Sequence, residues 1–301
     1  MIPQPQTLEL DLTRVQRRAM DFLALAKPRV VMMVLVTTYV GFYLGTRAAV
    51  DYSQLLRTLI GTALAAGGTL ALNQFLERDV DARMQRTRLR PLPDGRLQPA
   101  EALIFGSAIT LAGILYLAVG VNLLSAAVTA ATSVSYLCLY TPLKRKTSLC
   151  SLVGAVPGAL PPVTGWVAAH DGFGIEAWIL FAILFLWQLP HSLAIARLYR
   201  DDYVRAGIRF LPIVEPDGRS TGRQIVINCI ALLPVGMLPT LVGLAGPAYF
   251  VAALVFGIVF LGYAVAFAVS RTAPAARQLL LASLLYLPAV LIVMALDKIP
   301  F

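Results

Sequence analysis

Long apolar segments dominate this sequence and limit what it can fold into. They recur from residue 29 to residue 296, each close to the roughly 20 residues that a helix needs to cross about 30 Å of hydrocarbon. A soluble domain of 301 residues would need more ionic surface than 58% hydrophobic and 14% charged residues can supply. We therefore expect an all-α polytopic membrane protein, a bundle of about nine transmembrane helices around a central apolar cavity. The expected spans are residues 29–46, 55–76, 100–118, 121–141, 149–169, 176–196, 224–243, 247–270 and 278–296.

Basic residues are concentrated in every second segment between these spans. Of the 25 Lys and Arg residues, 22 lie in alternate segments, and the others are Arg47, Arg57 and Lys298. Because positive connections stay on the cytoplasmic side, we expect a cytoplasmic N-terminus and an outer C-terminus. The net charge of +9 then needs no nucleic-acid partner. Residues 1–27 carry neither a signal peptide pattern nor an Arg- and Ser-rich transit peptide, which favours the inner (plasma) membrane of a bacterium.

The connections at residues 77–99 and 197–223 are the longest, and both are expected on the cytoplasmic side. Each mixes acidic with basic residues, and connections of such length are usually functional or disordered. We expect both to form one polar site at the mouth of the cavity. No separate soluble domain fits between spans, so residues 28–298 are expected to form a single transmembrane domain after the N-terminal segment 1–27.

A ladder of oxygen-bearing side chains leads into the first of these connections. Asn73, Glu77 and Asp81 are four residues apart, so a continuous helix places them within about 80° of one another. They span about 12 Å, too far to ligate one Mg²⁺ together, so two ions or one ion with its waters fit better. Because Mg²⁺ is usually held by one or two carboxylates and substrate phosphates, the implied ligand is a diphosphate. The alternative is a solvated helix end held by i,i+4 ion pairs.

Cationic side chains follow this ladder. Arg83, Arg86, Arg88 and Arg90 suit bidentate bonds to phosphate oxygens, although arginines that only set the topology are the alternative. Lys144, which lies in another cytoplasmic connection, is a further candidate to bind diphosphate. Its alternative is to reach the lipid headgroups.

A second polar segment closes the sixth expected span. His191 follows Pro190, where an interrupted helix leaves polar groups free to face a cavity. It is a candidate ligand or acid–base group, and a hydrogen-bonded packing histidine is the alternative. Asp201 and Asp202 are candidates for a second Mg²⁺, and Arg200 for the diphosphate, unless the aspartates only pair with neighbouring arginines.

These motifs together resemble the UbiA-type intramembrane prenyltransferases, over roughly residues 25 to 295. The superfamily pattern NDxxDxxxD is met by Asn73, Glu77 and Asp81, with Gln74 in place of the usual first aspartate. That departure is similar to the heme-farnesylating branch, whose pattern NxxxExDxD also includes Asp79. Further matches to that branch are Met84, Arg86, Thr87, Arg90 and Pro91, then Lys27, Pro28 and Arg29, the Tyr140–Lys144 run, Gly154 to Gly165, and Trp187, Gln188, Pro190 and His191.

The resemblance implies transfer of the farnesyl group of farnesyl diphosphate to a vinyl group of heme b, with addition of water, giving heme O. It implies Mg²⁺ as cofactor, the lipid bilayer as environment, and suggests a downstream heme A synthase as partner. The implied Mg²⁺ ligands are Asn73, Glu77, Asp79 and Asp81, with Asp201 and Asp202. Lys27, Arg29, Arg83, Arg86, Arg90, Lys144 and Arg200 would bind diphosphate, and Trp187, Gln188 and His191 would bind heme. His191 would either ligate the heme iron or position the water.

Some residues depart from this branch, and two rival functions remain. Ser192 stands where the branch usually has an aromatic residue and Phe210 where Met is common, and the second aspartate motif is met only loosely by Asp201 and Asp202. One rival is a related prenyltransferase that acts on an aromatic quinone precursor. The other is a multi-pass transporter of an anionic metabolite, which would not need the carboxylate ladder.

Overall fold

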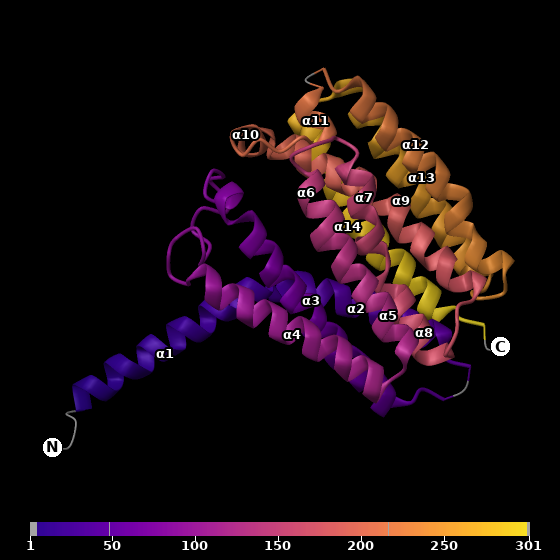
Figure 1. Ribbon diagram of the computed structural model, residues 1–301. Helices are drawn as coiled ribbons and strands as arrows, with labels where there is room; N and C mark the ends of the chain where they lie inside the picture. Colours follow the sequence, from indigo (N-terminus) through magenta and orange to yellow (C-terminus); the bar gives the residue numbers. More distant parts are fainter. Residues whose placement is uncertain (1–4, 48, 216, 300–301) are drawn as a thin grey trace.

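The computed structural model describes residues 5–47, 49–215 and 217–299, which are helical almost throughout (Figure 1). Within these residues, nine helical segments are long and apolar enough to cross a membrane, which confirms the predicted all-α protein with about nine spans. They are α2 (Pro28–Gly45), α3 (Tyr52–Asp81), α4 (Pro99–Gly120), the composite spans Leu123–Leu143 and Cys150–His170, α9 (Ile175–Leu198), α12 (Arg219–Leu241), α13 (Pro247–Ser270) and α14 (Ala273–Leu296).

Two spans are not single α-helices. Leu123–Leu143 consists of α5 (Leu123–Val134), the π-helix η1 (Ser135–Tyr140) and α6 (Thr141–Leu143), whereas Cys150–His170 consists of α7 (Cys150–Ala159) and α8 (Pro161–His170). α7 ends where Pro161 and Pro162 follow, because proline has no N–H to continue the helical hydrogen bonds. The shorter helices α10 (Arg200–Arg205) and α11 (Leu211–Val214) lie in the connection after α9.

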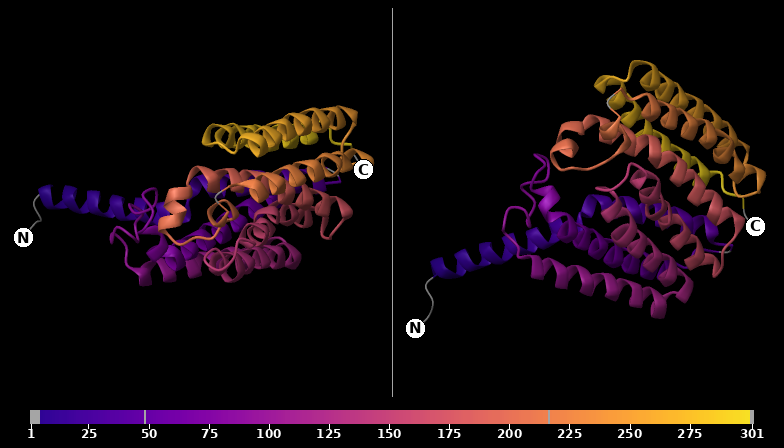
Figure 2. Two further views of the ribbon diagram at one scale, coloured as in Figure 1. Left: turned by 90° about the horizontal axis from the view of Figure 1, so that it is seen from above. Right: turned by 45° about the horizontal axis from the view of Figure 1, so that its top comes forward.

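α1 (Pro5–Ala26) extends away from the bundle in all three ribbon views (Figures 1 and 2). Its C-terminal half is attached to the start of α4 and to the connection before it. Phe22 contacts Phe105 with ring centroids 5.0 Å apart, and ion pairs join Arg18 to Glu101 and Asp21 to Arg96. The last residues of α1 are therefore held in a defined place beside α3 and α4.

Small residues let several spans approach closely. A Cβ atom at Gly165 of α8 would lie 1.9 Å from the carbonyl oxygen of Thr38 in α2, and one at Gly113 of α4 would lie 2.4 Å from the backbone nitrogen of Ala65 in α3. Such contact between backbones is typical of membrane helices, which associate by van der Waals packing rather than by a hydrophobic effect. It holds α2 against α8 and α3 against α4, and so fixes the position of the polar end of α3.

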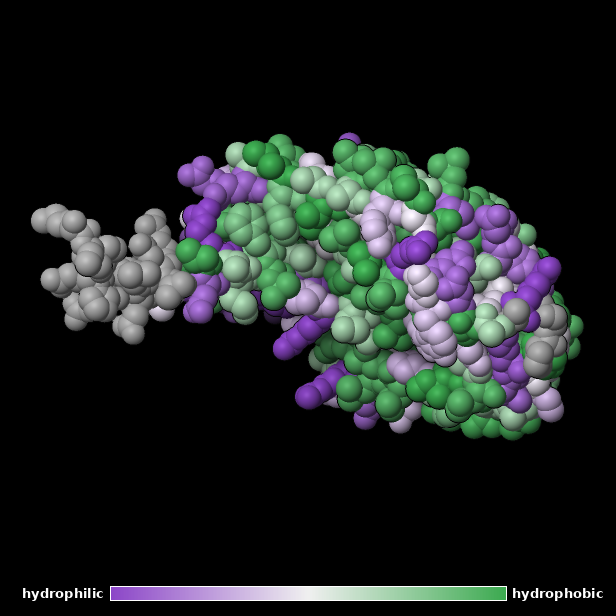
Figure 3. Space-filling model, turned by 90° about the horizontal axis from the view of Figure 1, so that it is seen from below, coloured by the Kyte–Doolittle hydropathy of each residue, from purple (hydrophilic) through white to green (hydrophobic). Residues whose placement is uncertain are grey.

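The outer surface of the bundle is apolar. Large hydrophobic side chains are exposed along the spans, among them Ile104, Val119 and Val269. Figure 3 shows hydrophobic residues over much of the surface in that view, with hydrophilic residues in patches at its left and over its right-hand part. This arrangement fits a lipid environment, because exposed side chains at that depth meet hydrocarbon.

Arg47, Arg57 and Lys298, the three basic residues outside the alternate segments expected on the cytoplasmic side, all contact groups near helix ends. The Lys298 ammonium donates to the carbonyl oxygens of Tyr43 and Thr46, each at 2.6 Å, and Arg57 donates to the carbonyl oxygen of Gly120 at 3.4 Å. Arg47 lies 3.2 Å from Nε2 of His170. Cations are stabilised at helix C-termini because the last carbonyl groups there lack helical partners.

Candidate active site

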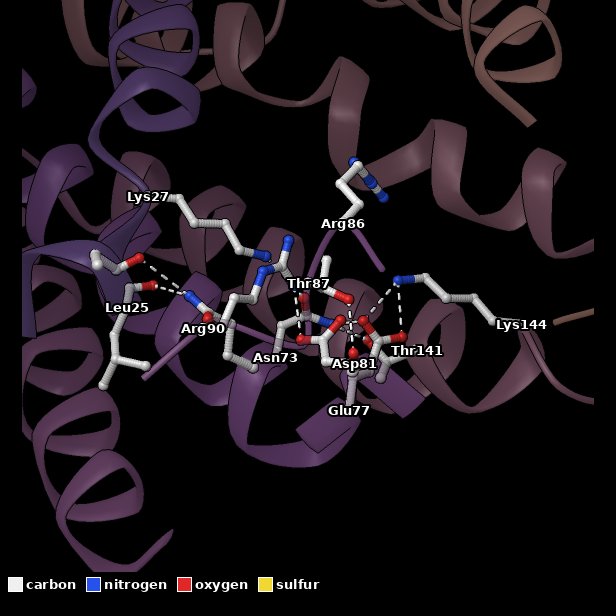
Figure 4. A network of polar contacts seen from close by, with 12 residues as sticks. Leu25, Lys27, Asn73, Glu77, Asp81, Arg86, Thr87, Arg90, Thr141 and Lys144 are labelled. Carbon is white, nitrogen blue, oxygen red and sulfur yellow. Dashed lines mark hydrogen bonds and ion pairs between the residues drawn. The ribbon is translucent and has the colours of Figure 1, made fainter. Parts of the chain in front are cut away.

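The three side chains of the ladder lie on one face at the end of α3 (Figure 4). α3 continues to Asp81, and its last carbonyl oxygen accepts a hydrogen bond from the Thr87 hydroxyl at 2.8 Å. Asn73 and Asp81 are each 2% exposed, while the side chain of Asp79, on the opposite face, is 76% exposed. The helical continuation that the ladder requires is thus present.

Each oxygen-bearing side chain of the ladder is paired with one cation. The Lys27 ammonium donates to Oδ1 of Asn73 at 3.3 Å. Lys144 contacts both carboxylate oxygens of Glu77, at 2.8 and 3.0 Å, and Arg90 donates to Oδ2 of Asp81 at 2.6 Å. The three cations come from three different segments, so the fold assembles a compact group of alternating charge (Figure 4).

Asn73 is held by the polar end of the fourth span. Its Nδ2 donates to Glu77 at 3.0 Å and to the Thr141 hydroxyl at 3.1 Å, and Thr141 in turn donates to the carbonyl oxygen of Tyr136 at 2.8 Å. That last bond spans five residues, because η1 directly precedes Thr141. π-Helical turns are frequent at functional sites, where they change the direction of the side chains that follow.

The backbone between α1 and α2 directs Lys27 toward the ladder. Lys27 is in the left-handed region, with φ of 50°, and no glycine is present to relieve that conformation. Gln74 stabilises the preceding turn, since its Nε2 donates to the carbonyl oxygens of Ala24 at 3.2 Å and Leu25 at 2.8 Å. An aspartate at this position would place an anion against two carbonyl oxygens, which gives a physical reason for glutamine here.

The two lysines of the site have pKa values shifted in opposite directions. Burial, together with the nearby Arg90 and Lys144 cations, lowers the pKa of Lys27 to about 7. Burial also disfavours the charged form of Lys144, but the Tyr140 ring and the Glu77 carboxylate outweigh it, so the pKa of Lys144 is raised. Its Nζ lies 4.4 Å from the centroid of Tyr140. Lys144 therefore stays a cation, while Lys27 changes charge near neutral pH.

The connection after α9 supports the connection after α3. Asp202 accepts hydrogen bonds from the backbone nitrogens of Gln85 at 3.2 Å and Arg86 at 3.4 Å, and it pairs with Arg205. Partial burial would raise the pKa of Asp202, but these hydrogen bonds lower it overall. Below them, Met84 is buried in the same apolar cluster as Tyr203. Asp202 is thus engaged with backbone and arginine, and its role as a second Mg²⁺ ligand stays a prediction.

Arg86 is placed by two tyrosines of that second connection. Its guanidinium lies 4.9 Å from the ring centroid of Tyr199 and donates to the Tyr203 hydroxyl at 3.4 Å. The backbone nitrogen of Arg209 donates to the carbonyl oxygen of Lys144 at 2.7 Å, so the same connection also fixes Lys144.

Other predicted residues are not brought into this network. The side chains of Arg29, Arg83 and Asp201 are exposed, and neither they nor Arg200 make a side-chain hydrogen bond or ion pair in the described part of the chain. Asp79 approaches only its neighbour Arg78, at 3.9 Å. Their assignment to diphosphate or Mg²⁺ stays a prediction.

The predicted heme-binding residues form a separate group inside the bundle. His191 Nδ1 lies 2.8 Å from the Ser283 hydroxyl, and its ring stacks on Trp187 with centroids 4.9 Å apart. Gln188 donates to the carbonyl oxygen of Ala155 at 2.6 Å. A Cβ atom at Gly158 would lie 2.1 Å from Oε1 of Gln188, so this glycine leaves room for the amide. α9 stays continuous through Pro190, contrary to the expected interruption before His191.

Several residues that hold the site in place were not predicted from the sequence. Thr141, Tyr140 and Thr87 lie within motifs that resemble the family but carried no assigned role, and Ser283 lies in an otherwise apolar span. The only available signal for Ser283 was a hydroxyl at membrane depth, which needs a hydrogen-bond partner. Within the described residues, no group of three or more His, Cys, Asp or Glu side chains is placed to hold a metal without further ligands.

Comparison with known proteins identifies the family. The model of the UbiA prenyltransferase family matches residues 34–287. Relatives named protoheme IX farnesyltransferase include one from Solibacter usitatus, 50% identical over 92% of this chain and 98% of that protein, and one from Aquifex aeolicus, 38% identical over 93% of this chain and 95% of that protein.

Solved structures share the fold. One described as digeranylgeranylglyceryl phosphate synthase has a TM-score of 0.79 at 14% identity and covers 93% of this chain and 98% of its own. A UbiA homologue from Archaeoglobus fulgidus, described as bound to GPP and Mg²⁺, has a TM-score of 0.61 at 16% identity and covers 91% of this chain and 99% of its own. Fold, ladder and relatives together establish that this chain belongs to the UbiA prenyltransferase family.

Proposed function

We propose that this protein is a heme O synthase. It transfers the farnesyl group of farnesyl diphosphate to a vinyl group of heme b, and water supplies the hydroxyl group of the product while diphosphate leaves. The support is the name shared by relatives that are 38–50% identical along most of the chain. Prenyl transfer also needs what this sequence offers, a cation-rich polar group at the end of apolar helices.

The pairing of each ladder oxygen with a cation is the observation that carries this proposal. Asn73, Glu77 and Asp81 supply only oxygen ligands, which suit Mg²⁺, and two carboxylates are the number that Mg²⁺ usually takes from protein when phosphates complete its coordination. Bound Mg²⁺ would neutralise the diphosphate charge and favour its departure. These oxygens and their cations are then expected to exchange partners when substrate binds, the oxygens binding the metal and the cations binding phosphate.

The cations of the site would bind and orient the diphosphate. Lys144 and Arg90 already face the ladder, and Arg86 is held beside them by Tyr199 and Tyr203. Charge-assisted hydrogen bonds to phosphate strengthen as the C1–oxygen bond breaks and negative charge gathers on the leaving group. The vinyl carbon of heme then forms a bond to C1 of the farnesyl cation. Water adds to the resulting porphyrin-conjugated cation and loses a proton.

The membrane bundle would shelter this allylic cation. We propose a central apolar cavity whose polar mouth contains the ladder and opens to the cytoplasm, which supplies farnesyl diphosphate. The alternating basic segments support this orientation, with the N-terminus cytoplasmic and the C-terminus outside, in the plasma membrane of a bacterium. The product is the substrate of an enzyme that makes heme A, so a downstream heme A synthase is the partner that we propose.

One assay separates this function from its rivals. Purified protein in lipid nanodiscs is incubated with Mg²⁺, farnesyl diphosphate and reduced heme b, and the pigments are resolved by chromatography and mass spectrometry. We expect heme O and released diphosphate. A parallel reaction replaces heme b with an aromatic quinone precursor, and vesicles containing the protein test for uptake of labelled diphosphate. Prenylated quinone precursor or uptake, in place of heme O, would overturn the proposal.

A further inference from the structure

A second polar cluster lies away from the ladder, between α9 and α14. We call it the His191 cluster, and it consists of Trp187, His191 and Ser283. Ser283 is fully buried, at 0% exposure, whereas the Trp187 and His191 rings are half-buried. A polar group at this depth is costly unless it is satisfied, so such groups in membrane spans are usually functional.

The hydrogen bonds of Ser283 determine which nitrogen of His191 carries the proton. The Ser283 hydroxyl lies 2.6 Å from the carbonyl oxygen of Leu280 and 2.8 Å from His191 Nδ1. A carbonyl oxygen only accepts, so the single hydroxyl proton must lie between Ser283 and Leu280. The hydroxyl oxygen is then left as an acceptor, and His191 Nδ1 must donate to it. The neutral ring therefore carries its proton on Nδ1 and a free lone pair on Nε2.

Ser283 also fixes the orientation of the neighbouring ring through a different atom. Its backbone carbonyl oxygen accepts a hydrogen bond from the Trp187 indole nitrogen at 2.8 Å. Trp187 and His191 are stacked with an interplanar angle of 22°. One residue of α14 thus holds both rings of α9. Removing only the hydroxyl leaves the backbone bond to Trp187 in place.

The surroundings of His191 favour coordination over proton transfer. In the described part of the chain, the His191 ring makes one hydrogen bond, to Ser283, and one ring contact, with Trp187; neither residue is charged, and Nε2 has no hydrogen-bond partner there. A protonated ring would lack the carboxylate that normally stabilises an imidazolium in acid–base catalysis. A neutral imidazole with Nδ1–H bonded to an oxygen acceptor is instead the usual form of a histidine that binds a metal through Nε2.

We infer that Ser283 is a positioning residue that presents Nε2 of His191 to the iron of the tetrapyrrole substrate. This inference rests on the proposed function, because the iron belongs to the heme b that is to be farnesylated. It assigns His191 to iron binding rather than to activation of water. Coordination would hold the iron at a fixed distance from His191 and so limit where the vinyl groups of the porphyrin can lie.

Heme b binding to the full-length protein tests this role without requiring turnover. The affinity is measured by titration of the Soret absorbance, and the iron–histidine stretching band of the ferrous complex is recorded by resonance Raman spectroscopy. The frequency of that band depends on the hydrogen bond made by Nδ1. A contact that only supports the fold would leave the frequency unchanged. In Ser283→Ala we expect a lower band frequency and roughly 10- to 100-fold weaker heme binding. His191→Ala should lose the band.

Ser192→Ala is the matched control. Ser192 directly follows His191, and its hydroxyl donates to the carbonyl oxygen of Leu189 at 3.1 Å, away from the ring. This variant should keep the wild-type band and affinity. The inference is overturned if the band persists in His191→Ala, if wild-type protein shows no such band, or if Ser283→Ala matches wild type in both measurements. If the same wild-type preparation still forms heme O, those outcomes refute only the role of Ser283 and His191. Absence of heme O refutes the proposed function instead.

Discussion

The segments at residues 77–99 and 197–223 each contain six arginines and four acidic residues, but they lie differently with respect to the ladder. Both follow a long span, and both mix arginines with aspartates. In the first, Arg90 contacts Asp81 directly. In the second, Asp202 contacts the backbone of the first connection. The comparison teaches that two similar charged segments can divide one task, so that one supplies the groups at the site and the other holds them in place.

The largest expected effect comes from the carboxylates of the first region. Glu77→Gln and Asp81→Asn keep the size of each side chain but remove the charge that Mg²⁺ and the cations need. We expect each to lower kcat for heme O formation by at least about 100-fold. Asp79→Asn tests the predicted metal role of a carboxylate whose exposed side chain points away from the ladder: turnover near wild type would remove Asp79 from the Mg²⁺ ligands, and a loss as large as in the ladder variants would retain it. Near-normal turnover in both ladder variants would contradict the assignment.

Gln74→Asp should have a smaller effect, which acts through α1. The new carboxylate would face the carbonyl oxygens of Ala24 and Leu25 and displace the turn that holds Lys27. We expect kcat/KM for farnesyl diphosphate to fall about 10-fold, mainly through KM. Gln74→Glu keeps the length of the glutamine side chain but introduces the same negative charge as Gln74→Asp, so we expect the same rise in KM. Unchanged KM in both variants would show that this turn does not position Lys27.

Asp202→Asn tests whether the second region only supports the first. An amide can accept one of the two backbone hydrogen bonds but pairs poorly with Arg205, so the Arg86 backbone should loosen. We expect a rise of about 3- to 10-fold in KM for farnesyl diphosphate, with an unchanged Mg²⁺ requirement. Asp201→Asn is measured alongside it, because Asp201 is the other predicted ligand of a second Mg²⁺, and a higher Mg²⁺ requirement in that variant would support this role. A several-fold rise in the Mg²⁺ concentration needed for half-maximal rate would instead make Asp202 a metal ligand.

The smallest effect is expected at Glu215, which supports the start of α12. Its carboxylate accepts from the backbone nitrogens of Ser220 at 2.8 Å and Thr221 at 3.0 Å, and although partial burial would raise its pKa, these bonds lower it overall. The pKa of Glu215 is lower in the folded protein than in the unfolded chain. Its stabilising effect is therefore fully present at a pH above the usual pKa of Glu, and it is lost as the pH falls through the lower pKa of the folded protein.

Hydrogen exchange measures this loss. Protection of the Ser220 and Thr221 amides should fall roughly 3- to 10-fold on acidification, and Glu215→Gln should show that lower protection already at neutral pH. Asp217→Asn, which alters a neighbouring exposed carboxylate, should leave the protection of Thr221 unchanged. Equal protection in Glu215→Gln and wild type would remove Glu215 from this role.

Local pattern predicted the spans and the ladder, whereas long-range contacts decided the rest. The four-residue spacing of Asn73, Glu77 and Asp81 has a clear meaning once the segment is helical. No such rule pairs Asp202 with Gln85, since those residues are 117 positions apart. The π-helix before Thr141 also has no periodic signature in so apolar a segment. Sequence therefore predicted which oxygen-bearing side chains share one face of α3, but not the groups that orient them.

The contact between Lys298 and the end of α2 has a consequence for how the protein is made. It joins Lys298, which follows the ninth span, to the end of the first span, where the carbonyl groups of Tyr43 and Thr46 accept both hydrogen bonds. Synthesis runs from the N-terminus, so this contact forms only after all the intervening spans have been inserted. Without Lys298, the carbonyl oxygens of Tyr43 and Thr46 lose these two hydrogen bonds, so the contact distinguishes a bundle with all nine spans in place from a partly inserted one.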